Sequence, residues 1–434
     1  MRTFKGGIHP KDYKHFSNKK PIEKMPLPKK VIIHLSQHIG KPSQAIVKKG
    51  DLVKTGQKIS EPAGFVSIPM HSSISGKIVD IGNYPHPNGT IQKAIVIESD
   101  GKDEWIDTIE ENMDYMELPI DEIKSKIAHA GICGMGGAGF PANVKLSPPK
   151  DKPIDTVILN GVECEPFLTA DHRLMLERTD GIISGLRILM KILNAKQGYI
   201  GIESNKPDAI EKMKNELNGK SNIKVIPLKL KYPQGAEKQL IYACTKRKVP
   251  VGGLPMDVGV VVQNVGTALA VYEAIKYNKP LIERVTTITG SIVKEPKNLL
   301  VRIGTPVFDM IEFCGGITEN IGKLISGGPM MGFAIADITT PIAKTSSGFV
   351  LLSENEVNKD SENTCIRCGR CVDACPMNLA PSLIVNNVKH KKYEQAKLLN
   401  IMDCIECGSC GYVCPANIQL VQWIKAGKLE VGKL

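Results

Sequence analysis

Two cysteine runs near the C-terminus constrain this chain more than any other feature of its sequence. Eight of the twelve cysteines fall in them, and each run reads C-x2-C-x2-C-x3-C followed by proline. The runs are Cys365, Cys368, Cys371 and Cys375 before Pro376, and Cys404, Cys407, Cys410 and Cys414 before Pro415. This is the bacterial spacing for paired cubane iron–sulfur clusters, in which the fourth thiolate of each run crosses to the other cluster.

The spacing therefore predicts two [4Fe-4S] clusters with crossed ligands. The predicted sets are Cys365, Cys368, Cys371 and Cys414 for one cluster, and Cys404, Cys407, Cys410 and Cys375 for its partner. Structural zinc sites are the competing interpretation, because they also use C-x2-C pairs. Zinc does not call for a third cysteine two residues on and a fourth before proline, so the pattern favours clusters.

The length of 434 residues is enough for about three domains with a sizeable core. The metal-ligand grouping of the cysteines, and the lack of an apolar signal segment after Met1, indicate a reducing cytosol rather than a secreted disulfide protein. We expect no bilayer-spanning segment, since no run of 18 apolar residues occurs.

The net charge of +11 is concentrated at the N-terminus. Residues 1–60 carry 14 Lys and Arg against 3 Asp and Glu, and the rest of the chain is balanced. Prolines among the lysines of residues 1–30 predict an extended basic arm that orders only against a partner. The candidate partners are an anionic membrane surface or an acidic protein, and the alternative is a solvated tail. No nucleic-acid partner is expected, because few aromatics are interleaved and no recognition motif follows.

Residues 31–118 predict a small β-domain, because short apolar runs alternate with glycine turns. Residues 47–59 and 69–78 resemble the lipoyl/biotinyl barrel-sandwich family. A carrier domain of that family needs a lysine at its hairpin tip, where residues 67–71 read SIPMH. We therefore expect a structural barrel-sandwich hybrid and not a swinging arm.

Residues 119–280 predict an α/β domain, with a helix over 118–129 and a buried strand over 156–159. Between them, residues 134–145 read GMGGAGFPANVK. Such a glycine loop lets backbone N–H groups approach an anionic ligand, and Lys145 adds a positive charge. A glycine loop alone is weak evidence, because many are plain turns.

Three further blocks make the loop more specific: NGVECEP at 160–166, YPQGAE at 232–237 and VQNVGT at 262–267. In this order the four blocks resemble the flavin-carrying, NADH-binding subunit of respiratory complex I. The resemblance implies FMN contacts from Gly134, Gly136, Gly137, Lys145, Asn160, Glu163, Gln263, Asn264 and Thr267, with Gly139 in the same loop. It implies nicotinamide dinucleotide contacts from Ala138, Phe140, Glu165, Tyr232 and Glu237, and hydride transfer near Gly137 and Glu165. Val162 and Ala236 stand where that family has acidic residues.

Residues 281–352 resemble the β-grasp (SLBB-like) module that follows the flavin domain in that family, with a tight loop SGGPMMG at 326–332. A polar linker, 353–363, then leads to a two-[4Fe-4S] ferredoxin-like domain at 364–434. The predicted fold is therefore multidomain α/β and α+β: barrel-sandwich hybrid, complex I flavoprotein-like domain, β-grasp module and ferredoxin-like domain.

This order, with FKGGIHP at 4–10, resembles the C component of the Rnf-type ion-translocating ferredoxin:NAD oxidoreductase complexes. The resemblance implies an NADH-linked enzyme with FMN and two [4Fe-4S] clusters, peripheral at the cytoplasmic face of the membrane. Its partners would be other subunits of the complex, NADH and, indirectly, ferredoxin. A cobalamin-reductase-type flavoprotein and a non-catalytic iron–sulfur relay are the alternatives.

Overall fold

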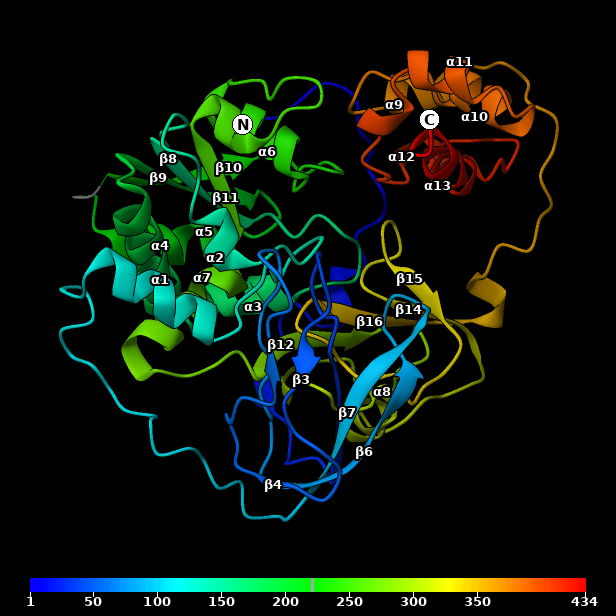
Figure 1. The fold of residues 1–434 in the computed structure, drawn as a ribbon. Coiled ribbons are helices and arrows are strands. Elements are labelled where there is room, and N and C mark those ends of the chain that lie inside the picture. Colours follow the sequence, from blue (N-terminus) through cyan, green and yellow to red (C-terminus); the bar gives the residue numbers. More distant parts are fainter. Residues whose placement is uncertain (220–221) are drawn as a thin grey trace.

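The chain folds into four units, which a computed structural model describes for residues 1–219 and 222–434. In Figure 1 a β-rich N-terminal unit lies at the bottom, an α/β unit at the upper left, a second β-unit at the lower right and a helical C-terminal unit at the upper right. This is the predicted multidomain organisation. In the part of the chain that the structure describes, every helix is too short or too polar to cross a lipid bilayer.

The N-terminal unit is a barrel sandwich of a four-stranded and a two-stranded sheet. The larger sheet has the order β2 (Lys30–His34), β7 (Ile91–Ser99), β6 (Gly76–Pro85), β4 (Leu52–Val53), and the smaller pairs β3 (Gln44–Ala45) with β5 (Ser60–Glu61). Strands β2 and β7 are buried on both faces, with Ile33 and Ile32 in different apolar clusters. Burial on both faces explains why their sequences are continuous apolar runs instead of alternating ones.

The hairpin region of this unit is buried. Residues 67–71 all lie in the interior, with Ile68 1% and Met70 0% exposed. A segment packed in this way presents no free tip, which agrees with the expectation of a structural module.

The α/β unit is built on four parallel strands in the order β10 (Ile223–Leu228), β9 (Gln197–Glu203), β8 (Thr156–Gly161), β11 (Val260–Asn264). One face is covered by α1 (Ile120–His129), α4 (Thr179–Leu193), α5 (Pro207–Leu217) and α7 (Val265–Tyr277), and the other by α6 (Glu237–Thr245). The predicted helix and strand are thus found as α1 and β8. Parallel strands covered on both faces present their carboxyl ends, and the loops after them, at one edge.

The second β-unit is a six-stranded mixed sheet that includes a strand from the N-terminal arm. Its order is β1 (Ile22–Lys24), β13 (Lys297–Arg302), β12 (Glu283–Thr289), β16 (Gly348–Ser353), β14 (Ile321–Ser326), β15 (Phe333–Ile335), with α8 (Val307–Phe313) against it. Strand β1 pairs parallel to β13, with Ile22 opposite Asn298.

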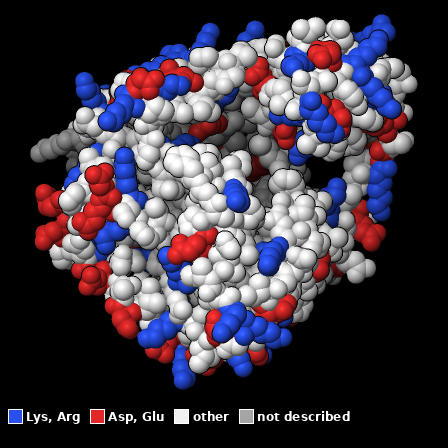
Figure 2. Space-filling view, viewed as in Figure 1, with Lys and Arg blue, Asp and Glu red and all other residues white. Residues whose placement is uncertain are grey.

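The prediction that the arm would order only against a partner is wrong. Phe4 and Ile8 are 6% and 5% exposed, Lys14 is 4% exposed, and β1 completes a sheet of the same chain. The arm is anchored by single apolar side chains and by strand pairing. The prediction considered only its lysines and prolines, which reveal neither contribution. The positive charge does not gather into one patch on the face in Figure 2, where Lys and Arg are interspersed with Asp and Glu.

The C-terminal unit is helical and internally repeated. It contains α9 (Arg370–Ala374), α10 (Pro381–Lys389), α11 (Tyr393–Leu398), α12 (Ser409–Tyr412) and α13 (Leu420–Val431). The short helices α9 and α12 each follow a left-handed glycine, Gly369 at φ +76° and Gly408 at φ +80°. Each helix begins inside a cysteine run, so the two runs share one local conformation.

Asn298 joins three parts of the molecule and provides a test of the packing. It is 0% exposed, donates to Ser17 O at 2.9 Å, and accepts from Thr169 Oγ1 and Thr287 Oγ1 at 2.9 Å each. Asn298→Ala leaves these buried groups without their partner and should lower the free energy of unfolding by about 2–4 kcal/mol.

Thermal unfolding followed by circular dichroism measures this loss as a lower midpoint. The matched control is Asn83→Ala on β6, where the side chain is exposed and a change below about 0.5 kcal/mol is expected. Equal midpoints for the two variants would show that Asn298 does not tie the units together.

The buried hairpin gives a second expectation. Intact mass spectrometry of protein from its native host should show neither lipoyl nor biotinyl addition, because residues 67–71 contain no lysine and are packed inside. Either modification on Lys77 or a neighbouring lysine would contradict the structural role of this unit.

Candidate functional site

The eight cysteines of the C-terminal unit surround two separate hollows. One is lined by Cys375, Cys404, Cys407 and Cys410. The other is lined by Cys365, Cys368, Cys371 and Cys414. Cys375 of the first run thus lies with the second run, and Cys414 of the second run lies with the first. We name the first group the inner cysteine set and the second group the outer cysteine set.

The inner cysteine set fits a metal cluster chemically. Burial raises the pKa of Cys404 to about 11 and that of Cys410 to about 12, so these thiols stay protonated unless a cation replaces their protons. The backbone N–H groups of Glu406 and Leu379 lie 3.4 Å from the sulfurs of Cys404 and Cys375. Such N–H groups stabilise thiolate ligands and tune the potential of a cluster.

The two sets differ in exposure. Cys365 and Cys368 of the outer set are exposed, as are the neighbouring Arg367 and Arg370. The inner set faces the α/β unit, because Tyr232 Oη donates to Cys407 O at 2.7 Å and Gln239 Nε2 donates to Pro376 O at 3.2 Å. The inner set is therefore next to the rest of the protein, and the outer set lies toward solvent.

The glycine loop begins and ends in a short bridge between Cys133 and Pro141, with Gly134 N donating to Phe140 O at 2.9 Å. Its middle, residues 136–138, is exposed. Gly137 has φ +106°, and no described atom lies within 4 Å of where its Cβ would stand. The loop thus holds bare backbone toward open space, as a site for an anionic group requires.

Residues of the later blocks lie directly beneath this loop. Met135 N donates to Thr267 Oγ1 at 2.9 Å, and a Cβ on Gly136 would come within 3.0 Å of Asn264 Nδ2. Asn264 also caps α7 by accepting from Gly266 N. The glycine loop, β11 and α7 therefore meet at one place.

The remaining predicted flavin contacts lie on α2 (Ala142–Lys145), at the end of β8 and in the loop after it, and on β11. Asn160 Nδ2 donates to Gly235 O at 2.8 Å, and Lys145 forms an ion pair with Glu237 at 2.7 Å. Glu163 accepts from Asp171 N at 2.7 Å at the start of α3 (Ala170–Glu177). The last of them, Gln263, lies on β11.

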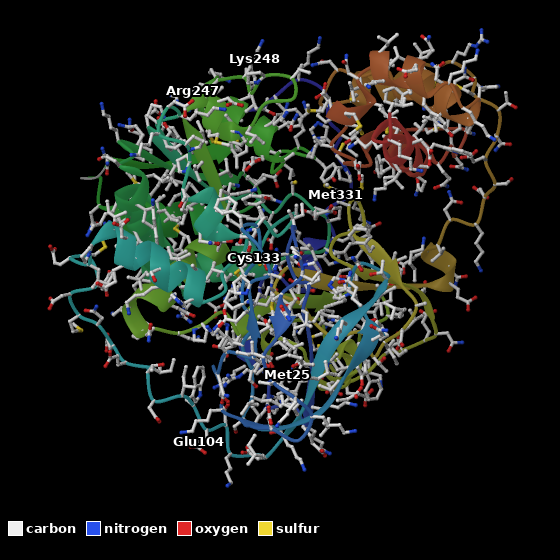
Figure 3. All side chains as sticks on the ribbon, viewed as in Figure 1. Met25, Glu104, Cys133, Arg247, Lys248 and Met331 are labelled. Carbon is white, nitrogen blue, oxygen red and sulfur yellow. The ribbon has the colours of Figure 1, made fainter. Side chains whose placement is uncertain are left out.

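Two predicted nucleotide contacts have other partners in this structure. Glu165 accepts from Met330 N and Met331 N, at 3.0 and 2.9 Å, on the 326–332 loop. Burial raises the pKa of this carboxyl to about 7. Tyr232 is 1% exposed against Cys407. Figure 3 shows Met331 on the loop that rises from the second β-unit toward the C-terminal unit.

The sequence did not point to three charged residues of this site, of which Lys14 and Arg284 are buried and Asp171 is half-buried. Asp171 accepts from Asn264 Nδ2 at 2.6 Å, and burial raises the pKa of its carboxyl to about 7. Arg284 donates to Met135 O at 3.3 Å behind the glycine loop, and Lys14 reaches the 163–168 loop from the arm. Of the three, only Asp171 could have been noticed in the sequence, because it lies shortly after the 160–166 block.

The arrangement fits FMN on two observations of this structure. The exposed glycine backbone has room for a phosphate, and Lys145 offers a positive charge nearby. Gln263 is 3% exposed, and its Nε2 has no hydrogen-bond partner among the described residues. A buried donor without a partner suits a ligand oxygen, because leaving it unpaired is costly. Figure 2 shows a hollow in the surface between the α/β unit and the C-terminal unit.

Four family models match the chain in the order of its units. They are the RnfC barrel sandwich hybrid domain at 2–102, the Nuo51 FMN-binding domain at 127–273, the SLBB domain at 285–334 and the 4Fe-4S dicluster domain at 357–415. Fold and site together define a flavin- and iron–sulfur-dependent oxidoreductase subunit. The units are named accordingly below: barrel sandwich, flavin domain, β-grasp unit and dicluster domain.

Curated relatives cover nearly the whole chain. The chain is 54% identical over 431 residues to the C component of the proton-translocating ferredoxin:NAD(+) oxidoreductase complex of Clostridium ljungdahlii, covering 99% of this chain and 94% of that protein. It is 46% identical over 429 residues to the C component of the Na(+)-translocating complex of Acetobacterium woodii, with 99% and 97% coverage. The chain belongs to the family of these C components.

A solved structure shares part of the fold. An NAD+-reducing [NiFe]-hydrogenase in the H2-reduced state matches with a TM-score of 0.50 at 15% identity, covering 72% of this chain and 64% of that chain. At this identity the match supports the architecture alone.

The grouping of Cys375 with the second cysteine run makes a spectroscopic prediction. Cys375→Ala should perturb the same cluster signal in electron paramagnetic resonance as Cys404→Ala does, because both side chains line one hollow. A spectrum that matches Cys365→Ala instead would mean sequential ligation within each run.

Proposed function

We propose that this chain is the NADH-oxidising or NAD+-reducing subunit of an ion-translocating ferredoxin:NAD oxidoreductase complex. Nicotinamide exchanges two electrons as hydride and a [4Fe-4S] cluster accepts one at a time, so bound FMN supplies the chemistry that joins them. The chain itself supplies a glycine cradle, a countercharge at Lys145 and eight thiols in two sets.

One observation carries the proposal: the 160–166 block, which contributes to the flavin site, and the inner cysteine set are linked through consecutive contacts. The 160–166 block holds Glu165, which lies 3.5 Å from Tyr232 Oη, and Tyr232 Oη in turn donates to Cys407 O at 2.7 Å. A two-electron site and a one-electron carrier are useful together only when they are close. Here they share the same buried side chains.

Each group of residues then has a role. The backbone of Gly134, Gly136 and Gly137 holds the FMN phosphate, and Asn160, Glu163, Gln263, Asn264 and Thr267 orient the flavin. Ala138, Phe140 and Glu237 line the nucleotide side. Glu165 binds nucleotide only if it releases Met330 N and Met331 N.

The difference in exposure between the two cysteine sets determines the order in which electrons pass through the clusters. The inner set, beside Tyr232, exchanges electrons with the flavin domain. The outer set, with exposed Cys365 and Cys368, exchanges them with the other subunits of the complex and, through these, with ferredoxin. NAD(H) belongs to the cytosol, so the chain lies at the cytoplasmic face of the membrane.

Separating the two halves of the reaction by mutation tests this function. Gly137→Val fills the open space above the loop with a branched side chain, and a misplacement of about 1 Å can cost on the order of 100-fold in rate. We expect NADH oxidation to fail with every acceptor while both clusters keep their spectra.

The matched control is Gly50→Val, since Gly50 has φ +100° and no described atom near its Cβ position, but lies in a turn of the barrel sandwich. It carries the same backbone strain and should keep full activity. Full NADH oxidation by Gly137→Val would refute a flavin site at this loop.

Cys404→Ala tests the other half. It should preserve NADH-driven reduction of a dye that accepts electrons from flavin, and stop delivery to the native partner subunits. Purified protein that contains flavin and reduces the dye with NADH is an enzyme and not a non-catalytic relay. If it does not reduce an added corrinoid, it is also not a cobalamin reductase.

A further inference from the structure

The N-terminal arm passes between the flavin domain and the dicluster domain. In Figure 1 it starts beside α6 and runs between these two units before entering the lower part of the molecule. Arg2 Nη1 donates to Cys244 O in α6 at the start of this path. The arm is therefore placed where the two redox-carrying units face each other.

At the dicluster domain the arm binds the loop of the inner cysteine set. Gly7 N donates to Ala374 O at 2.9 Å. Gly6 has φ +78°, and a Cβ there would stand 2.6 Å from Cys375 O, closer than real Cβ contacts allow. Only glycine fits at position 6 without moving the backbone of a predicted cluster ligand.

At its next residue the arm binds Tyr232 of the flavin domain. Ile8 N donates to Tyr232 O at 2.8 Å, and Tyr232 N donates to Ile8 O at 2.9 Å. Tyr232 Oη reaches Cys407 O at 2.7 Å. One tyrosine is thus fixed through its backbone by the arm and through its side chain by the dicluster domain.

At its far end the arm supports the loop that carries Glu163 and Glu165. Lys14 is 4% exposed, donates to Glu165 O at 2.9 Å and to Leu168 O, and lies 4.0 Å from Glu163 Oε2. A buried ammonium group is costly unless it is fully paired, so these contacts locate Lys14 firmly.

Aromatic stacking reinforces this end. The ring of Tyr13 stacks on Phe167 with centroids 4.6 Å apart, and Phe167 N donates to Asp12 O at 2.8 Å. Tyr13, Glu163 and Phe167 all have positive φ. Non-glycine residues hold such a conformation only where their surroundings fix it, which indicates that arm and loop shape each other.

We propose that residues 4–17 form a strap that fixes the separation of the 163–168 loop of the flavin site and the inner cysteine set, with Gly6 and Lys14 as its positioning residues. The proposal rests on the proposed function, because it assigns the strap to electron transfer between those sites. The covalent connection through residues 353–363 is mostly exposed. The rate of electron transfer falls steeply with distance, so a loosened strap slows that step first.

The first test compares Gly6→Ala with Gly101→Ala. Gly101 has nearly the same φ, +76°, but no described atom lies within 4 Å of its Cβ position. In stopped-flow experiments with holoprotein and NADH, both variants should bleach the flavin at the wild-type rate. In Gly6→Ala, reduction of the clusters should then be slower by about 10-fold or more, while dithionite still yields wild-type cluster spectra.

A second readout does not depend on activity. Hydrogen–deuterium exchange should increase at residues 4–9 and 370–376 in Gly6→Ala and remain unchanged in Gly101→Ala. Wild-type cluster reduction together with wild-type exchange in Gly6→Ala would overturn the strap. Failure of the wild-type protein to reduce its flavin with NADH would instead refute the proposed function.

Lys14→Met tests the far end, with Lys19→Met, on the exposed surface just beyond the strap, as control. Lys14→Met keeps the length of the side chain but removes its donors, so exchange at residues 163–168 should increase and the KM for NADH should rise more than kcat falls. Lys14→Arg should restore part of the protection. Unchanged exchange and KM in Lys14→Met would show that the arm does not position this loop.

Discussion

Tyr232 is the point at which the parts of this protein are held together. Its backbone pairs with Ile8 of the arm, and its hydroxyl donates to Cys407 O of the dicluster domain. The same hydroxyl lies 3.5 Å from Glu165, which receives two N–H groups of the β-grasp loop. Burial beside this carboxyl raises the pKa of the phenol, so it remains a donor. Four separate segments therefore meet through one residue.

Charged side chains are buried beside the loop that follows β8, and their burial is unfavourable for folding. Lys206 and Glu203 are 1% and 0% exposed and lie 3.7 Å apart, while Lys206 Nζ also donates to Val162 O. Each ion removed from water costs several kcal/mol unless its partners are well placed. The backbone carbonyls of this loop supply part of the compensation, so the loop is fixed by electrostatics as well as by packing. A rigid cradle is what orientation of a ligand requires.

The sequence predicted those features whose chemistry depends on local spacing. The cysteine runs and the glycine loop each lie within a short motif, and the four family models match the units in order. The role of the arm was mispredicted, because its anchors are single residues whose partners lie far along the chain. Asp171 was missed because an acidic residue in the first turn of a helix usually serves the helix itself.

The contact between Gly7 and Ala374 also bears on how the chain is assembled. A chain leaves the ribosome with its N-terminus first, and domains generally fold as they emerge. Residues 4–8 have their partners in the flavin and dicluster domains, so they wait until the dicluster domain has been synthesised. Contacts this distant in sequence are slow to form. Residues 4–8 thus reach their native place long after they are synthesised, and a chain truncated before the dicluster domain never forms the contact between Gly7 and Ala374.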